Sequence, residues 1–334
     1  MRAVSLVDAE RLEVVDIPAP EPETGELLIR VSACGICGSD LTSYKRGLFI
    51  GVPGHEVAGI VESVGAGVED WGRGDAAVLQ PSGGCRECDQ CRAGDYHRCI
   101  ESLTGAGTVR PGGYAELMAA RADRLRRLPD GLVPEVACLA EPLSVAIHGI
   151  RRVSLDSGED AIVLGLGSIG LLSVAGLRWL GAGRVYGVDP VGIRRELASG
   201  LGADAVFARS SEARAAVDGA PVVLECSGRP EAVQQALDLA RHGGRVVLLG
   251  IAVAEVTVVP VFWITREITV TGSINSQFED FEEALRLLAA RPEVAKIVTT
   301  RIGLADVPAT FQELLHPTRV GKVVIDPRLR VEVK

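Results

Sequence analysis

The first third of the chain is a series of short apolar runs separated by glycine and proline. Between Ala3 and about Ala120, segments such as 27–31 and 57–64 carry several branched aliphatic residues and end at turn-forming residues. Runs of this length and composition are typical of β-strands. The pattern predicts an all-β region of the barrel type.

The pattern changes near Pro134. Residues 135–151 place alanine, leucine and valine on one face and predict a helix, and from Ala161 on short strands alternate with helices such as 169–180. The expected strands are residues 161–164, 184–188, 222–225, 245–250 and 268–271, and the tail adds a helix at 279–290 and a strand at 322–325. Such alternation is typical of a parallel sheet covered by helices on both faces. The fold class is therefore predicted to be α/β, with a doubly wound parallel sheet beside a β-rich part.

Charge and the length of the apolar segments exclude several classes of protein. With 35 basic and 44 acidic residues the formal net charge is −9, so the overall positive field that nucleic-acid binding needs is absent. The apolar run 246–254 ends at Glu255, far short of the about 18 residues of a membrane-spanning helix. Asp8 and Glu10 leave no apolar core for a secretory signal. We expect a cytoplasmic protein of two domains without nucleic-acid or membrane partners.

A glycine-rich motif follows the first strand of the alternating region. It consists of Gly165, Leu166, Gly167, Ser168, Ile169 and Gly170, and it leads into an apolar helix. In this G-x-G-x-x-G pattern the first glycine makes a tight turn, the second lets backbone amides approach a pyrophosphate, and the third allows close helix–strand packing. The start of the helix faces the anion. The motif predicts a dinucleotide site.

The next strand ends at Asp189, 19 residues after Gly170. An acid at this position accepts hydrogen bonds from the adenine-ribose hydroxyls and repels a 2′-phosphate, which predicts NAD rather than NADP. Arg194 and Arg195 follow on the next expected helix. We count Arg194 among the candidate cofactor contacts, although either arginine could be solvated or packed over the adenine.

Four of the eight cysteines are clustered at Cys85, Cys88, Cys91 and Cys99. They occupy a hydrophilic, glycine-rich segment that could not bury a core of its own, and four thiolates at this spacing match a closed, structural zinc site. An iron–sulfur cluster is a chemical alternative for four thiolates. The flanking charged residues Arg86, Glu87 and Asp89 indicate a solvated lobe and favour zinc.

A second group of potential ligands is spread over the first half of the chain. Cys37 and the pair His55 and Glu56 supply a thiolate, an imidazole and a carboxylate, and Glu141 supplies another carboxylate. These are suitable ligands for a zinc ion that keeps one coordination position free. Cys37 and one carboxylate would balance the charge of Zn²⁺, whereas a second carboxylate would leave the site anionic and weaken its Lewis acidity. We therefore expect one of Glu56 and Glu141 to bind zinc directly. The other would lie beyond the zinc ligands or exchange with water at the metal.

These motifs together resemble those of the zinc-containing medium-chain dehydrogenases, especially the polyol (sorbitol) and threonine dehydrogenase branch. The matching segments are 34–40 (CGICGSD), 54–56 (GHE), the four cysteines at 85–99, 141–145 (EPLSV) and 165–170 (GLGSIG). The resemblance implies catalytic zinc on Cys37 and His55 with Glu56 or Glu141, and structural zinc on the four clustered cysteines. It also implies a discontinuous, GroES-like catalytic domain, 1–148 with 277–334, a Rossmann domain at 149–276, and a homodimer or homotetramer.

One departure from the family concerns the proton path. Many relatives carry histidine two residues after the aspartate of the first motif, and this chain has Thr42 there. Ser39 can still take the alcohol proton, but Thr42 cannot serve as an imidazole base. Tyr44, His148 or water could take its place.

The resemblance implies an NAD-dependent zinc enzyme that oxidises a secondary hydroxyl of a polar polyol, cyclitol or amino alcohol. A threonine-type or aminocyclitol dehydrogenase is an alternative within this class, because Glu141 could hold a substrate ammonium group. A dinucleotide-binding protein without turnover is the alternative from another class. The presence of both Cys37 and His55 argues against it, since such a protein would be expected to lose these ligands.

Overall fold

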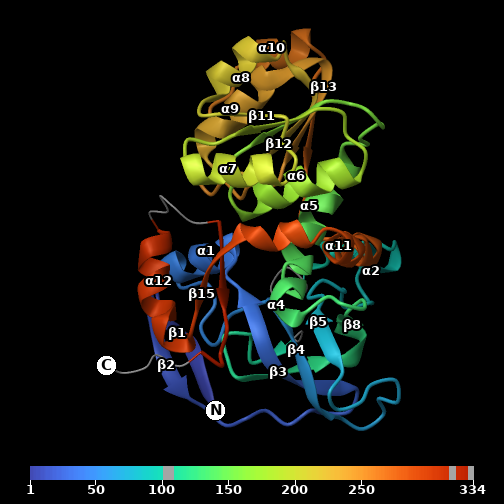
Figure 1. Ribbon diagram of the computed structural model, residues 1–334, viewed down its shortest axis with the longest axis vertical. Coiled ribbons are helices and arrows are strands. Elements are labelled where there is room, and N and C mark those ends of the chain that lie inside the picture. Colours follow the sequence, from blue (N-terminus) through green and yellow to red (C-terminus); the bar gives the residue numbers. More distant parts are fainter. Residues whose placement is uncertain (101–108, 316–320, 330–334) are drawn as a thin grey trace.

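The computed structural model places the strands in three sheets (Figure 1) and describes residues 1–100, 109–315 and 321–329. A mixed eight-stranded sheet contains β3 (Glu26–Gly35), β4 (Glu56–Val64), β5 (Ala76–Leu79), β6 (Val109–Arg110), β7 (Leu117–Arg121), β8 (Leu125–Arg127), β15 (Val298–Ile302) and β16 (Lys322–Ile325). A separate hairpin pairs β1 (Arg2–Asp8) with β2 (Arg11–Asp16). The β-rich region predicted at the start of the chain is therefore present.

Strand β16 brings the C-terminal part of the described chain into this sheet, between β15 and β3. It pairs with the last residues of β3, with Val324 opposite Gly35 and Ile325 opposite Cys34. The other side of β3 is occupied by β4. The two ends of the chain thus share one sheet, and β16 lies beside the segment that carries Cys37.

The other strands form a six-stranded parallel sheet in the order β11-β10-β9-β12-β13-β14. These strands are β9 (Ala161–Leu164), β10 (Val185–Val188), β11 (Ala205–Phe207), β12 (Ala220–Glu225), β13 (Ala240–Leu248) and β14 (Thr269–Gly272). In chain order this is the 3-2-1-4-5-6 arrangement of a dinucleotide-binding Rossmann fold. The helices that cover the sheet include α6 (Ser168–Trp179), α7 (Gly192–Gly200), α8 (Ser210–Ala216), α9 (Pro230–Leu239) and α10 (Pro260–Thr265). The predicted fold class is confirmed.

Two helices lie between the sheets, α5 (Ala140–Arg152) and α11 (Phe278–Ala290), as Figure 1 shows. Their apolar faces share one buried cluster with α6 and the parallel sheet. The expected domain limits at 148/149 and 276/277 remain a prediction, and the first of them falls inside α5.

Two predicted elements differ in detail. The helix expected at 135–151 is divided into α4 (Pro134–Ala137) and α5. The break lies four residues before Pro142, because proline has no amide hydrogen and its ring collides with the preceding turn. Strand β13 begins at Ala240 rather than 245, because Ala240 pairs with Ala220 ahead of a polar, glycine-containing bulge that hides the strand pattern.

The remaining helices of the described residues lie mostly in the β-rich half. They are α1 (Gly38–Arg46), α2 (Asp89–Arg92), α12 (Val307–Leu314) and the 3₁₀ helices η1 (Tyr96–Arg98), η2 (Ala122–Arg124), η3 (Pro292–Ile297) and η4 (Leu304–Asp306). The exception is η3, which packs against α6, α7 and α11. No helix among the described residues is long and apolar enough to cross a membrane.

Candidate active site and metal centres

Three of the four predicted ligands of the catalytic metal lie together. Donor atoms of Cys37, His55 and Glu56 are all within 4.8 Å of one another. Cys37 is the residue before helix α1, and His55 and Glu56 stand at the start of β4. The order of strands brings these segments together because β3, which leads to Cys37, pairs with β4. A thiol, an imidazole and a carboxylate in such proximity fit a zinc ion with an open position.

Asp40 holds the surroundings of Cys37 and His55 in place. Its carboxylate accepts hydrogen bonds from the Cys37 amide (2.9 Å) and the Tyr114 hydroxyl (2.7 Å), and it lies 3.6 Å from His55 Nδ1. A carboxylate against one ring nitrogen fixes the tautomer and leaves the other nitrogen for a metal. Sequence reasoning quoted Asp40 within the first motif but did not assign this role, and Tyr114 was missed because it is distant in sequence.

Lys322 on β16 is the second residue that sequence reasoning missed. Its ammonium group donates to a Glu56 carboxylate oxygen at 2.6 Å and to the Ile36 carbonyl at 2.9 Å. Burial works to lower the pKa of Lys322, but Glu56 and Cys37 together raise it above its usual value. The lysine is therefore charged and neutralises one carboxylate beside the candidate metal.

The motif around Cys37 leaves room for this ion pair. A Cβ atom at Gly35 would overlap Glu56 Oε2 and come within 2.8 Å of Lys322 Cε. The glycine is thus required by the close approach of two side chains from β4 and β16. This gives a packing reason for glycine between Cys34 and Ile36.

Glu141 is buried at the first turn of α5, outside the group of three donors that lie within 4.8 Å of one another. Burial raises the pKa of Glu141 to about 7, an effect that the charge of His55 partly offsets and that Glu56 reinforces. Burial alone would lower the pKa of His55, but Asp40 and Cys37 raise it well above its usual value. Glu141 is therefore close enough to His55 and Glu56 for their charges to change its pKa, although it lies outside the group of three donors.

The candidate residues of the proton relay differ in burial and in hydrogen-bond partners. Ser39 is half-buried in the first turn of α1, two residues after Cys37. Thr42 donates its hydroxyl to the Gly38 carbonyl within the same helix. Tyr44 is buried against Phe311 and donates to the Glu10 carbonyl, so its hydroxyl is engaged within the β-rich half. His148 bonds to Asp280 through Nδ1 at 2.7 Å.

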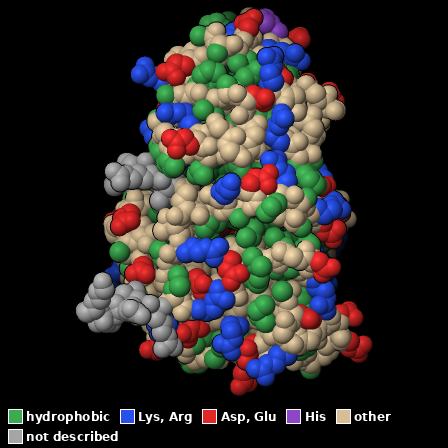
Figure 2. Space-filling model, in the orientation of Figure 1, with side chains coloured by type: hydrophobic (Ala, Val, Ile, Leu, Met, Phe, Trp, Pro, Cys, Tyr) green, Lys and Arg blue, Asp and Glu red, His purple; other side chains and the backbone are tan. Residues whose placement is uncertain are grey.

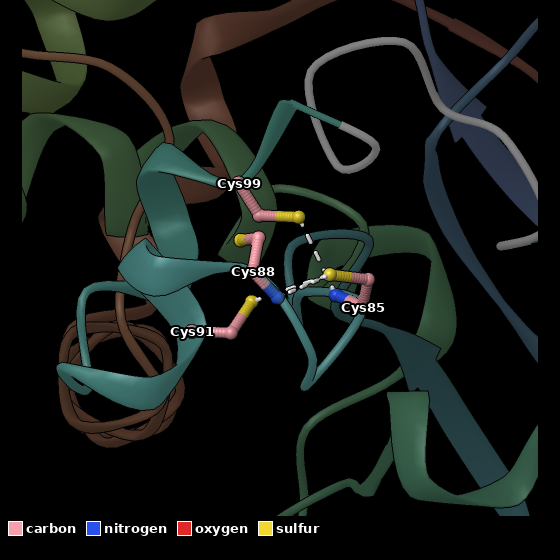
Figure 3. Close-up of side chains that lie close together, drawn as sticks. All are labelled: Cys85, Cys88, Cys91 and Cys99. Carbon is pink, nitrogen blue, oxygen red and sulfur yellow. Dashed lines mark hydrogen bonds between the residues drawn. The ribbon is translucent and has the colours of Figure 1, made fainter.

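The four clustered cysteines also converge, as Figure 3 shows. Cys85 Sγ lies 3.9 Å from Cys91 Sγ and accepts hydrogen bonds from the amides of Glu87 and Cys88. Tetrahedral zinc with bonds of about 2.3 Å places its sulfur ligands about 3.8 Å apart, so the set fits structural zinc. Burial and the neighbouring thiols raise the pKa of Cys91 to about 11, so a bound cation would be needed to keep Cys91 as a thiolate at neutral pH.

The dinucleotide motif has the geometry that its sequence predicts. Gly165 has φ +89°, and a Cβ at Gly170 would overlap the Gly165 carbonyl oxygen, whereas the space beside Gly167 is open. The motif joins β9 to α6, which begins at Ser168 and continues through Ile169. The turn, the helix start and the open side together can receive a pyrophosphate.

Asp189 follows β10 and holds this turn. One carboxylate oxygen accepts the Leu166 amide and the other the Val191 amide, each at 2.8 Å. Arg194 lies 3.6 Å from the same carboxylate, and Arg195 donates to the Asp189 carbonyl. The sequence predicted the place of Asp189 but not its bond to the glycine-rich turn.

Comparison with known proteins gives the family. Residues 23–130 match the alcohol dehydrogenase GroES-like domain and residues 168–290 the zinc-binding dehydrogenase model. The L-threonine 3-dehydrogenase of Anaeromyxobacter sp. (strain K) is 33% identical over 96% of this chain and 98% of its own length. The chain belongs to the zinc-binding alcohol dehydrogenase family.

Two further similarities agree with this family, and the first supports its polyol and threonine branch. Sorbitol dehydrogenase of Bacillus subtilis (strain 168) is 32% identical over 75% of each chain. A zinc-binding dehydrogenase of Sinorhizobium meliloti 1021, crystallised with NADP, superposes with a TM-score of 0.88 at 31% identity, covering 98% of this chain and 99% of that one. The expected family, its oxidoreductase class, and its use of zinc and a nicotinamide dinucleotide are confirmed.

Proposed function

We propose that this dehydrogenase oxidises a secondary hydroxyl of a polar polyol, cyclitol or amino alcohol with NAD. The observation that carries the proposal is the grouping of Cys37, His55 and Glu56 within 4.8 Å, with Glu141 and Lys322 around them. The names of the sorbitol and threonine dehydrogenase relatives support a polar substrate with a secondary alcohol.

Cys37, His55 and Glu56 would hold the catalytic zinc, with Glu141 as the exchanging carboxylate. A zinc ion held there supplies a Lewis acid that stabilises negative charge developing on the substrate oxygen. Asp40 orients His55, and Lys322 offsets the charge of Glu56. Lys322 adds one positive charge to that of zinc, opposite Glu56 and close to Cys37 and Glu141. This added charge supports a site in which both carboxylates are ionised, an arrangement that charge arithmetic from the sequence alone disfavoured.

The reaction transfers one hydride and releases one proton. A nicotinamide bound at the glycine-rich turn would supply the acceptor for the carbinol hydride, and Ser39 would take the hydroxyl proton while passing its own proton onward, so that a ketone results. Ser39 suits this role because it lies in the first turn of α1, two residues after Cys37, and is half-buried. The Thr42 hydroxyl already donates a hydrogen bond to the Gly38 carbonyl. We therefore propose that water, rather than Thr42, accepts the proton from Ser39.

The cofactor preference is proposed to be NAD. The Asp189 carboxylate lies at the end of β10 against the glycine-rich turn, where it would repel a 2′-phosphate. Arg194, 3.6 Å from that carboxylate, is partly neutralised by it, which supports a contact with the adenosine rather than with a phosphate.

The assembly is proposed to be a homodimer or a pair of dimers formed through the Rossmann half. Strand β14 is the last strand of the parallel sheet, and α10 and the preceding loop expose a row of large apolar side chains. These are Ile251, Val253, Val256, Val259, Val261, Phe262, Trp263 and Ile264. Hydrophobic side chains gather at the same end of the molecule, near the top of Figure 2. An apolar surface beside an open sheet edge favours self-association.

We also propose a cytoplasmic location, with no nucleic-acid partner. All eight cysteines are free thiols in the structure, which fits a reducing compartment. The formal net charge of −9 supports the proposal that the protein has no nucleic-acid partner.

An amino alcohol is the second candidate substrate, favoured by the buried Glu141. A carboxylate beside the reacting carbon could accept a substrate ammonium group as well as serve the metal. A threonine-type or aminocyclitol substrate would use this contact, whereas a neutral polyol would not.

The test is a screen of polyols, cyclitols and amino alcohols for NADH formation, with NADP in parallel and with Cys37→Ser as control. We expect NAD-dependent oxidation of at least one secondary alcohol that is lost in Cys37→Ser. Primary alcohols oxidised in preference to every secondary one, or equal rates in parent and control, would contradict the proposal.

A further inference from the structure

The four-cysteine lobe, residues 85–99, holds the segment that leads from the Rossmann sheet into α11. The Asn275 side chain donates to the His97 carbonyl at 2.9 Å, and the Gln277 side chain donates to the Gly94 carbonyl at 3.4 Å. The Phe278 amide donates to the Tyr96 hydroxyl, and the two rings stack with centroids 4.6 Å apart. Three hydrogen bonds and one ring stack thus join the lobe to residues 275–278.

This segment begins at the edge of the sheet where the dinucleotide motif lies. The register of the parallel strands aligns Leu164, Glu225, Leu248 and Gly272 in one row. Gly165 follows the first of these residues and Ser273 follows the last. Since ligands of open parallel sheets bind outside the carboxyl ends of the strands, residues 273–278 leave from the cofactor edge.

The backbone of the segment is held in an uncommon conformation. Asn275 has φ +54°, in the left-handed region that asparagine tolerates better than most residues. Its side chain makes the hydrogen bond to the lobe. The contact with His97 therefore also supports the turn by which the chain leaves β14.

On its other side the segment is joined to α5. Ser276 shares a hydrogen bond with Ser144 at 2.7 Å, and Asp280 accepts from the Gln277 amide and bonds to His148. His148 in turn lies against His97, with ring centroids 4.6 Å apart. The lobe, α5 and the start of α11 thus form one polar connection between the two halves.

We propose that the four-cysteine lobe positions the cofactor edge of the Rossmann domain through Tyr96 and Asn275, and so sets the affinity for the dinucleotide. The inference rests on the proposed function, because it assumes that NAD(H) binds at this edge. Tyr96 and Asn275 act here as positioning residues. The structural zinc then contributes to cofactor binding in addition to the stability of its own loop.

The test measures the Kd of NADH by fluorescence titration for the parent, Tyr96→Phe, Asn275→Ala and the double variant, with zinc content determined for each. Tyr96→Phe keeps the ring and removes only the hydroxyl. We expect each single variant to bind NADH roughly three- to tenfold more weakly, because the free energy of one hydrogen bond that holds the segment in its binding position is lost, and the double variant more weakly still. Zinc content should stay at the parent value, KM for NAD should rise, and kcat should not fall.

Tyr44→Phe is the matched control, because it also removes a hydrogen-bonded hydroxyl from the β-rich half, at the bond to Glu10. It should leave the Kd of NADH unchanged. Unchanged Kd in Tyr96→Phe and Asn275→Ala, or a weaker Kd only with loss of zinc, would overturn the inference. A parent protein that fails to bind NADH would instead refute the proposed function.

Discussion

The ammonium group of Lys322 lies 2.6 Å from a carboxylate oxygen of Glu56, and both side chains are buried. The pair joins β16, near the end of the chain, to the strand that begins beside His55. It therefore ties the C-terminal part of the chain to the candidate zinc site. Removing one member of such a pair leaves the other charge buried without a partner, which costs more than the pair itself contributes.

Lys322→Met should lower the free energy of unfolding by about 3 kcal/mol or more, because it leaves Glu56 unpaired. The matched control is Arg30→Met, which breaks an exposed ion pair with Glu62 between β3 and β4 and should cost less than about 1 kcal/mol. Denaturant unfolding of both variants gives the comparison. Equal losses of unfolding free energy in the two variants would contradict a larger contribution from the buried pair.

Cys91→Ser should lose one zinc equivalent per chain and melt at a lower temperature. Apparent binding free energies of structural zinc in small peptides are on the order of 10 kcal/mol at neutral pH, and removal of one ligand forfeits much of this. Cys226→Ser is the control, since Cys226 lies outside both metal groups and contacts Ser173. Elemental analysis and a melting curve check the prediction, which parent-like zinc content and melting temperature in Cys91→Ser would refute.

Asp189→Asn should shift the cofactor preference toward NADP. Asparagine keeps an oxygen that can accept the Leu166 amide but removes the charge that repels a 2′-phosphate, so the ratio of kcat/KM for NAD to that for NADP should fall roughly tenfold. Asp204→Asn, which affects an acid bonded to the Val185 amide at the opposite end of β10, should leave the ratio unchanged. A ratio unaltered in Asp189→Asn would assign this residue to holding the turn alone.

Zinc binding should release a proton from Glu141 at neutral pH. Burial raises its pKa to about 7, so in the metal-free protein the carboxyl group is about half protonated at pH 7, and zinc affinity should rise as pH increases through this value. Calorimetry in buffers of different ionisation enthalpy should show about half a proton fewer released in Glu141→Gln than in the parent. Because both proteins contain the same cysteines, thiol ionisation cancels in the difference. Equal proton release in the two proteins would contradict a coupling between zinc binding and the ionisation of Glu141.

The sequence predicted those parts of the fold and site that depend on local spacing. The glycine-rich turn, the end of β10 at Asp189 and the four cysteines each lie within a short stretch whose chemistry can be recognised directly. The break before α5 was not predicted, although Pro142 carries the local signal for it. Strand β13 was harder, since its early residues are polar and only pairing with β12 makes them part of the sheet.

The residues that sequence reasoning missed act across long distances in the chain. Lys322 meets Glu56 only because β16 pairs with β3, and Tyr114 reaches Asp40 across 74 positions. No periodicity connects such residues, so their contribution to charge balance could be found only from the fold. The hydrogen bonds from Asn275 and Phe278 to the four-cysteine lobe likewise join residues that are far apart in the sequence.

The central claim is that Cys37 helps to hold a catalytic metal whose loss stops chemistry without preventing cofactor binding. The most direct measurement compares NADH titration by fluorescence with steady-state alcohol oxidation in the parent, Cys37→Ala and Glu141→Gln. Cys37→Ala should lose about one zinc per chain and essentially all turnover while its Kd for NADH stays near the parent value, because the glycine-rich turn and Asp189 lie on the other sheet. Glu141→Gln should be milder. A Cys37→Ala protein that keeps near-normal turnover with parent-like zinc content would contradict the account.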